Sequence, residues 1–141
     1  MTRPRTPLVT ATLAALWLAA CGPDAVSIPE VEAFLAAPLP PGHRDLWMAS
    51  ETGIDRLVRL RFDAPEAEAD AFARRLVPEG LAAGEDPGLG LLGAGARGWI
   101  ADLPQGAVGG EARPRVDRVV KVVTAPAGPG LRRVWVAAFT L

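Results

Sequence analysis

Few residues in this chain could carry out chemistry. His43 is the only histidine, so a catalytic triad or a histidine metal site would have to use it. The serines are Ser27, which the pattern around it favours as a helix cap, and Ser50. A set of His43, Ser50 and Asp45 can be written down, but residues so close along one extended segment rarely converge. The G-x-S-x-G motif of many hydrolases is also missing, so the sequence does not favour a serine hydrolase.

Two carboxylate pairs and one glycine motif offer other chemistry. Glu66 and Asp70 fall in the first turns of an expected helix, and Glu85 and Asp86 in an expected loop, so we interpret both pairs as solvated charges. Residues 88–93 read GLGLLG and fit G-x-G-x-x-G. A dinucleotide site needs a strand directly before this motif and a helix directly after it. Because a loop and further glycines flank it here, we attribute the match to glycine enrichment.

Metal, disulfide and nucleic-acid chemistry are disfavoured by composition. Cys21 is the only cysteine, so the chain can form neither an internal disulfide nor a metal site built from several cysteines. Half of the residues are apolar and the formal net charge is −1, which argues against a disordered chain and against a polyanion-binding surface. We therefore predict no metal, no cofactor and no nucleic-acid partner.

The residues around Cys21 carry the clearest signal. Arg3 and Arg5 precede an uncharged, mostly apolar segment, residues 8–18, which is too short to cross a membrane as a helix of about 20 residues. The segment ends in Leu18-Ala19-Ala20-Cys21. This order of charge, apolar run, small residues and cysteine resembles the signal peptide and lipobox of bacterial lipoproteins.

The resemblance implies a lipid anchor. In such proteins, signal peptidase cuts before the cysteine, here between Ala20 and Cys21, and the thiol receives a diacylglyceryl group that inserts into a membrane. Gly22 stands where aspartate commonly favours inner-membrane retention, so we expect the periplasmic face of the outer membrane if the source has two membranes. Alternatively, Cys21 is an ordinary thiol after a cleaved secretory signal, or residues 8–20 remain as an anchor. The expected organisation is a cleaved signal peptide (1–20), a lipidated tether (21–26) and a single folded domain (27–141).

The pattern of the folded part predicts an α+β domain. Ser27-Ile28-Pro29-Glu30 has the form of a capping box, and apolar spacing predicts a short helix over 28–36. A second helix is expected over 65–77, with Asp63 as its cap. Alternating apolar residues predict one hairpin within 44–63 and another from 115–124 and 131–141. We expect a mainly antiparallel sheet of about four strands, with the second helix packed on one face.

The stretch between these elements, residues 79–114, is rich in glycine and predicts a long loop with one short strand at 99–101. Trp99 is our first choice for a recognition residue, because an exposed indole often dominates binding. A tryptophan that pins the loop to the core fits equally well. Arg59 and Arg61 share one face of a strand, and Arg132 and Arg133 lie on another strand. On an uncovered sheet face these arginines could form a basic patch that binds a carboxylate or phosphate. The alternative is a solvated strand face whose charges prevent aggregation.

The sequence therefore favours a non-enzymatic interaction or accessory domain over an enzyme. It would be held on the membrane through Cys21 and would contact another envelope protein through an exposed sheet face or through the 79–114 loop. The alternative is a small-ligand-binding or hydrolytic accessory domain in which the same loop covers a pocket.

Overall fold

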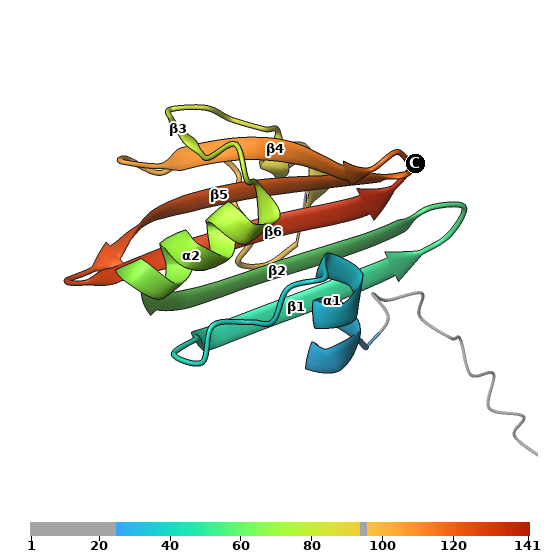
Figure 1. The fold of residues 1–141 in the computed structure, drawn as a ribbon, viewed down its shortest axis with the longest axis horizontal. Coiled ribbons are helices and arrows are strands. Elements are labelled where there is room, and N and C mark those ends of the chain that lie inside the picture. The colour runs from blue at the N-terminus through green and yellow to red at the C-terminus, as the bar shows by residue number, and fades with distance from the viewer. Residues whose placement is uncertain (1–24, 94–95) are drawn as a thin grey trace, which may run out of the picture.

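The computed structural model describes residues 25–93 and 96–141, and within them one antiparallel sheet of six strands has the order β1-β2-β6-β5-β4-β3 (Figure 1). The last strand in the sequence lies inside the sheet, between β2 and β5. The elements in chain order are α1 (Ile28–Leu35), β1 (Arg44–Thr52), β2 (Arg56–Pro65), α2 (Glu66–Leu76), β3 (Ala82–Ala83), the 3₁₀ turn η1 (Leu89–Leu92), β4 (Val108–Arg115), β5 (Arg118–Gly128) and β6 (Leu131–Thr140).

The expected four-stranded sheet is wrong. The two hairpins, β1–β2 and β5–β6, are present, but β4 and the two-residue β3 extend the sheet beyond β5. Strand β4 contains Gly109, Gly110 and Pro114, residue types that are depleted in strands. A Cβ atom on Gly109 would overlap the carbonyl oxygen of Glu85, so this glycine permits a close backbone approach. Gly109 and Gly110, which had suggested a loop, therefore belong to a closely packed strand.

The expected strand at residues 99–101 is also wrong, because these residues are irregular. They belong to a segment that lies against the sheet, which we call the covering loop (residues 84–93 and 96–107). Its glycines also have packing roles. A Cβ atom on Gly93 would overlap the Trp99 indole, and one on Gly90 would lie 2.5 Å from the carbonyl oxygen of Ala101.

Both predicted helices are present, but only the start of α1 uses the predicted cap. Helix α1 starts with a complete capping box: the Ser27 hydroxyl accepts from the Glu30 N–H, and the Glu30 carboxylate accepts from the Ser27 N–H at 2.8 Å. Helix α2 starts directly after Pro65 without a side-chain cap. The prediction that Asp63 caps α2 is wrong, because its carboxylate instead binds Arg133.

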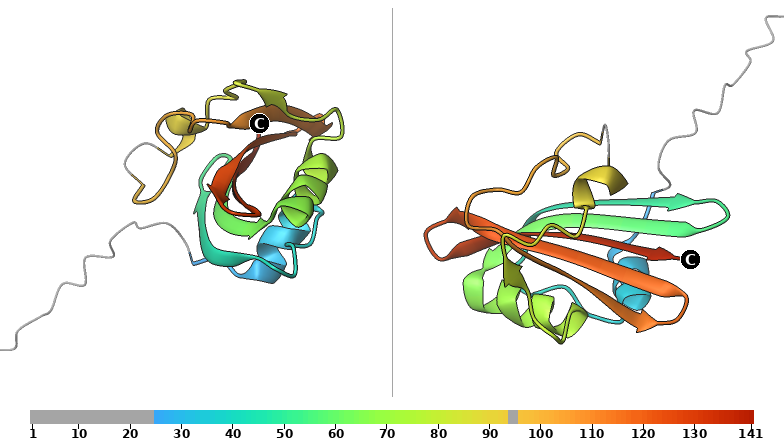
Figure 2. Two further views of the ribbon diagram at one scale, coloured as in Figure 1. Left: turned by 90° about the vertical axis from the view of Figure 1, so that its left-hand side faces the viewer. Right: turned by 90° about the horizontal axis from the view of Figure 1, so that it is seen from above.

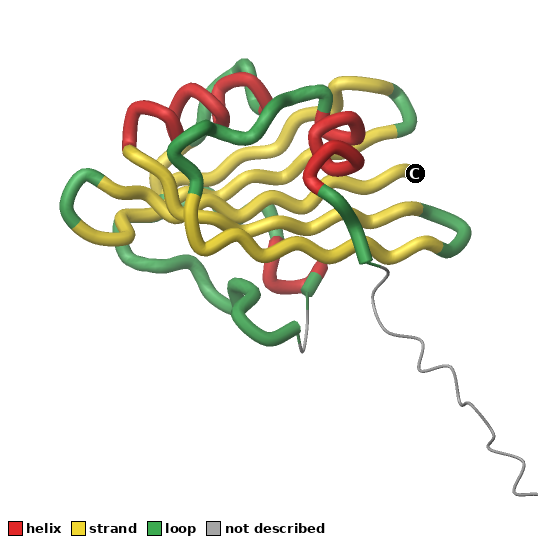
Figure 3. Tube along the Cα trace, turned by 90° about the horizontal axis from the view of Figure 1, so that it is seen from below, coloured by secondary structure: helices red, strands yellow, loops and turns green. Residues whose placement is uncertain are grey.

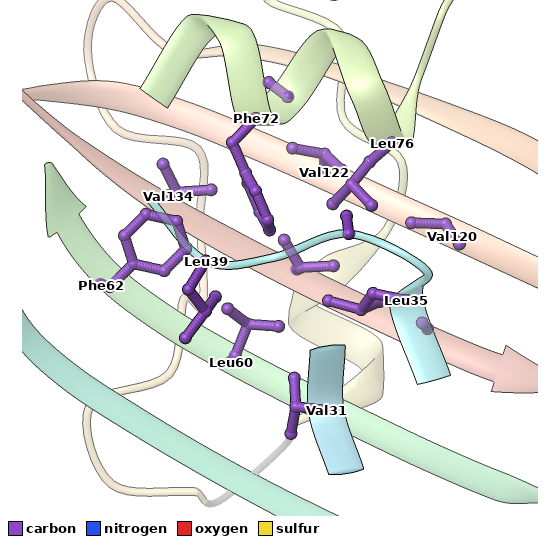
Figure 4. Packing of buried hydrophobic residues seen from close by; sticks show 14 of the residues in the cluster. Val31, Leu35, Leu39, Leu60, Phe62, Phe72, Leu76, Val120, Val122 and Val134 are labelled. Atoms are coloured by element: carbon purple, nitrogen blue, oxygen red, sulfur yellow. The ribbon is translucent and has the colours of Figure 1, made fainter. Parts of the chain in front are cut away.

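The main core lies between the two helices and one face of the sheet (Figures 3 and 4). Leu60 and Phe62 of β2 are fully buried, and the Phe62 ring meets that of Phe72 from α2 edge to face at 5.3 Å. Because side chains alternate along a strand, Arg59 and Arg61 point to the opposite face. The helix face of the sheet is therefore apolar, as its sequence predicted.

The opposite face is covered by the covering loop (Figure 2, right). A second apolar cluster forms there, with Leu89 and Ile100 from the loop packed on Trp135 and Ala137 of β6. Within the described ranges, no helix is both long and apolar enough to cross a membrane.

Candidate functional site

The expected lipidation residue, Cys21, and the expected cleavage site between Ala20 and Cys21 lie outside the described residues. The described chain begins at Ala25, four residues after Cys21, and α1 follows almost at once. The remaining predicted site residues, Arg59, Arg61 and Trp99, all lie on the loop-covered face of the sheet.

Arg59 is at the centre of this face. Only 5% of its surface is exposed, although a solvated strand face is the usual place for such a residue. Its guanidinium lies beside a pair of adjacent indoles, 5.9 Å from the ring centroid of Trp47 and 6.0 Å from that of Trp99. It donates to the Leu92 carbonyl oxygen at 3.2 Å and pairs with the Glu51 carboxylate. Arg59 is therefore an internal contact between the sheet and the covering loop.

Arg61 makes the next contact along β2. It donates to the Gly98 carbonyl oxygen at 3.0 Å and to the Asp45 carboxylate at 3.3 Å. Asp45 occupies a bulge in β1, where it has a φ of +54°, a conformation that aspartate tolerates better than most residues. The Asp45 carboxylate lies on the loop-covered face, while the next residue, Leu46, packs on the main core.

Arg133 of β6 completes the charged cluster. It donates to both oxygens of the Asp63 carboxylate at 2.7 and 2.8 Å, and it lies 3.5 Å from the Asp45 carboxylate. These hydrogen bonds, together with the two negative charges, raise the pKa of Arg133. The neighbouring Arg132 points to the helix face, where it contacts Glu66 and Asp70 at 3.5 and 3.7 Å. The two arginines therefore do not form one basic patch.

Trp99 holds the covering loop to itself and to the sheet. Its indole Nε1 donates to the Leu89 carbonyl oxygen at 2.8 Å, and its ring lies 5.7 Å from that of Trp47. The side chain is half-buried. This geometry matches the interpretation of Trp99 as a residue that pins the loop. A role in recognising a partner stays a prediction.

Sequence reasoning missed Lys121 of β5. It donates to the Pro87 carbonyl oxygen at 2.5 Å and pairs with Glu111 at 2.9 Å. Together with Arg59 and Arg61, it is one of the cations that donate to a carbonyl oxygen of the covering loop. Its position between Val120 and Val122 could have indicated a lone charge on the face opposite to the main core.

Several donors beneath the covering loop are buried without a hydrogen-bond partner among the described residues. They are the Nε atoms of Arg59 and Arg61 and the Nε1 atom of Trp135. Arg61 and Trp135 are direct cross-strand neighbours. An unpaired buried donor is costly, so a group of them marks a place where acceptor oxygens would be stabilised.

The residues of a hydrolytic triad do not come together. The His43 ring shares a 2.7 Å hydrogen bond with the Pro40 carbonyl oxygen just before β1, whereas Ser50 is buried near the far end of that strand. Ser50 is seven positions after His43, which corresponds to about 23 Å along an extended chain. The Ser27 hydroxyl belongs to the capping box. In the part of the chain that the structure describes, no three His, Cys, Asp or Glu side chains form a potential metal site.

The glycine motif at residues 88–93 also lacks the geometry of a nucleotide site. Gly88 has a left-handed conformation and starts the four-residue η1, and no α-helix follows directly. An open groove of about 520 Å³ lies at the other side of the sheet. It lies between the end of α2 and β4 and is lined by Arg75, Glu79, Glu111 and Arg113 among others.

The chain was compared with known proteins, and no protein-family model, curated protein or solved structure matches it.

Proposed function

We propose that this protein is a membrane-tethered lipoprotein of the bacterial envelope and acts as a non-enzymatic interaction domain. The observation that carries the proposal is the position of the lipobox-like sequence Leu18-Ala19-Ala20-Cys21, which ends six residues before the capping box at Ser27. A folded domain that follows so soon after an acylated cysteine stays close to the bilayer. Two or more acyl chains hold a protein stably on a membrane.

The chemistry of the described residues supports a role without catalysis. His43 and Ser50 are far apart, and the charged side chains of the loop-covered face are paired with one another or with loop carbonyl groups. Such pairing fixes a surface rather than activating a nucleophile.

The outer side of the covering loop is the surface that we assign to an envelope partner. Leu91 in η1 exposes 88% of its surface and Arg97 is exposed, although the loop beneath them is held by Arg59, Arg61 and Lys121. An apolar side chain on a preformed support can bind a partner with little loss of conformational entropy.

The intact mass of the membrane-extracted protein tests the anchor. We expect the mass of residues 21–141 plus acyl chains, and we expect the Cys21→Ala variant to lose the acyl chains. An unacylated wild-type protein, or one that retains residues 1–20, would exclude the proposal.

Photo-crosslinking tests the assigned surface. A photoreactive residue in place of Leu91 should capture an envelope protein in intact cells, whereas the same residue in place of Arg74, exposed on α2, should not. Equal capture from both positions, or none from position 91, would contradict the assignment to the covering loop.

A second candidate function is binding of a small anion beneath the covering loop. The observation in its favour is the group of buried, unpartnered donors on Arg59, Arg61 and Trp135. Inorganic phosphate or acetate should then raise the thermal midpoint of the wild-type chain more than sodium chloride at equal ionic strength. The Trp135→Phe variant, which lacks one donor, should respond less. Equal responses to all three salts would exclude this function.

A further inference from the structure

Three large apolar side chains are exposed at one end of the sheet. Ile54 and Val116 expose 104% and 96% of their surface, and Leu141 exposes 62%. Among the described residues the remaining exposed large apolar residue is Leu91, on the covering loop. Single exposed apolar residues are common on proteins, but these three come from three separate segments and gather at one end, which we call the apolar end.

The strand register places the three residues almost level. Arg56 of β2 donates its N–H to the Thr140 hydroxyl of β6 at 2.9 Å, and Arg118 of β5 lies opposite Thr140 on the other side. Ile54, Leu141 and Val116 each lie one or two residues beyond this row. The Leu141 N–H also donates to the Asp117 carbonyl oxygen at 3.0 Å. The apolar end is therefore a fixed edge rather than a set of independent chain ends.

Charged groups lie on the apolar end and directly behind it. The guanidinium groups of Arg56 and Arg118 lie over the ring of Phe34, at 5.0 and 4.2 Å from its centroid. Arg115 pairs with Asp117 at 3.2 Å. With the exposed Asp55 also present, the arginines and the acids nearly balance. The apolar side chains thus project beyond the charged groups. This order matches a membrane surface, where apolar acyl chains lie deeper than the polar headgroups.

Helix α1 links this end to the expected anchor. Arg118 donates to the Phe34 carbonyl oxygen at 2.5 Å, which fixes the end of α1 close to the turn that holds Val116. The helix is about 12 Å long, and a chain of six residues, the separation of Cys21 from Ser27, can reach at most about 20 Å. Figure 1 shows that the described chain begins in the half of the molecule that carries the β1–β2 turn and the C-terminus. A lipid at Cys21 can therefore lie in the same plane as the apolar end.

We propose that the apolar end docks onto the lipid bilayer surface, with the side chains of Ile54, Val116 and Leu141 in the headgroup region. This inference rests on the proposed anchor, because three side chains alone are too few for stable membrane binding. When this end docks, the strands of the sheet point away from the membrane surface. The covering loop then stays accessible to a partner.

Site-specific fluorescence on the lipidated full chain tests the docking. Cys21 carries the lipid, so a single introduced cysteine can be labelled with an environment-sensitive dye after Ile54→Cys, Val116→Cys or, as the control at the opposite end of the sheet, Pro129→Cys. Each protein is reconstituted in phosphatidylcholine vesicles. Quenching by aqueous iodide should be at least about threefold weaker at positions 54 and 116 than at position 129. Adding Ile54→Asn should partly restore quenching at position 116.

Two outcomes would overturn the inference. If the protein floats with the vesicles but positions 54, 116 and 129 are quenched equally, the docking is wrong and the anchor remains. If the wild-type protein does not float with vesicles at all, the proposed anchor fails and the docking fails with it. Because Ile54 and Val116 contact almost nothing else in the fold, their substitution should leave the thermal midpoint unchanged.

Discussion

The indole Nε1 of Trp99 donates a 2.8 Å hydrogen bond to the carbonyl oxygen of Leu89, ten residues earlier in the covering loop. This bond closes the loop on itself, while Arg59 and Arg61 attach it to the sheet. The described residues of the loop are therefore packed as a layer over the second face of the sheet, although most of them have no regular secondary structure.

Trp99→Phe should open the covering loop without unfolding the sheet. The substitution keeps an aromatic ring but removes the hydrogen bond to Leu89, which contributes about 1 kcal/mol. Trypsin should then cleave after the exposed Arg97 about fivefold faster, because cleavage follows the population of the open loop. The thermal midpoint should change little, and Leu91→Ala serves as the control. An unchanged cleavage rate in Trp99→Phe would mean that the bond does not hold the loop.

Arg59→Met should destabilise the protein by about 2 kcal/mol. It removes charge-assisted hydrogen bonds to Glu51 and Leu92 and the contacts with the two indoles, although methionine fills part of the same space. The matched control is Arg113→Met, because Arg113 is exposed and makes a single long ion pair. That variant should stay within about 0.5 kcal/mol of wild type. Urea unfolding measures both values, and equal effects would contradict the buried role of Arg59.

Gly109→Ala should destabilise the sheet edge by at least about 2 kcal/mol, because the new methyl group would overlap the backbone carbonyl oxygen of Glu85. Gly53→Ala is the matched control: its nearest neighbouring atom would lie 4.0 Å away, so alanine should be neutral or slightly stabilising there. Thermal unfolding distinguishes the two. A tolerated alanine at position 109 would show that the backbone at Glu85 and β4 do not approach each other so closely.

Glu30 should make the stability depend on pH. The hydrogen bond from the Ser27 N–H, followed by that from the Ser27 hydroxyl, lowers the pKa of Glu30 below its usual 4.5. Because the folded-state pKa lies below the unfolded value, this contribution is complete above about pH 4.5 and disappears as the pH falls through the folded-state pKa. Glu30→Gln should therefore be less stable than wild type at pH 7, and the difference should shrink at acidic pH. A pH-independent difference would exclude the capping carboxylate as its cause.

The elements that depend on residues close together in the sequence were predicted correctly. Val58, Leu60 and Phe62 alternate with charged residues and form β2, and the capping box at Ser27 starts α1 as expected. Strand β4 could not be predicted in this way, since Gly109 is required by a contact with Glu85, a residue 24 positions earlier. The number of strands therefore depended on a close approach between distant segments.

The burial of the charged residues on the loop-covered face could not be predicted from the nearby sequence either. Alternation placed Arg59 and Arg61 on one face, but nothing near them in the sequence indicates that carbonyl groups of residues 92 and 98 would cover them. The bulge at Asp45, with its φ of +54°, could not be foreseen from a regular alternation of residues along β1. Long-range contacts, rather than residue type, decide whether such a strand face is solvated.

The position of β6 between β2 and β5 has a consequence for how the protein is made. A growing chain that still lacks β6 holds β1 and β2 on one side and β3 to β5 on the other, with no strand to join them. The apolar faces of both parts then lack their largest common partner. Folding of the complete sheet must therefore wait until residues 131–140 have left the ribosome.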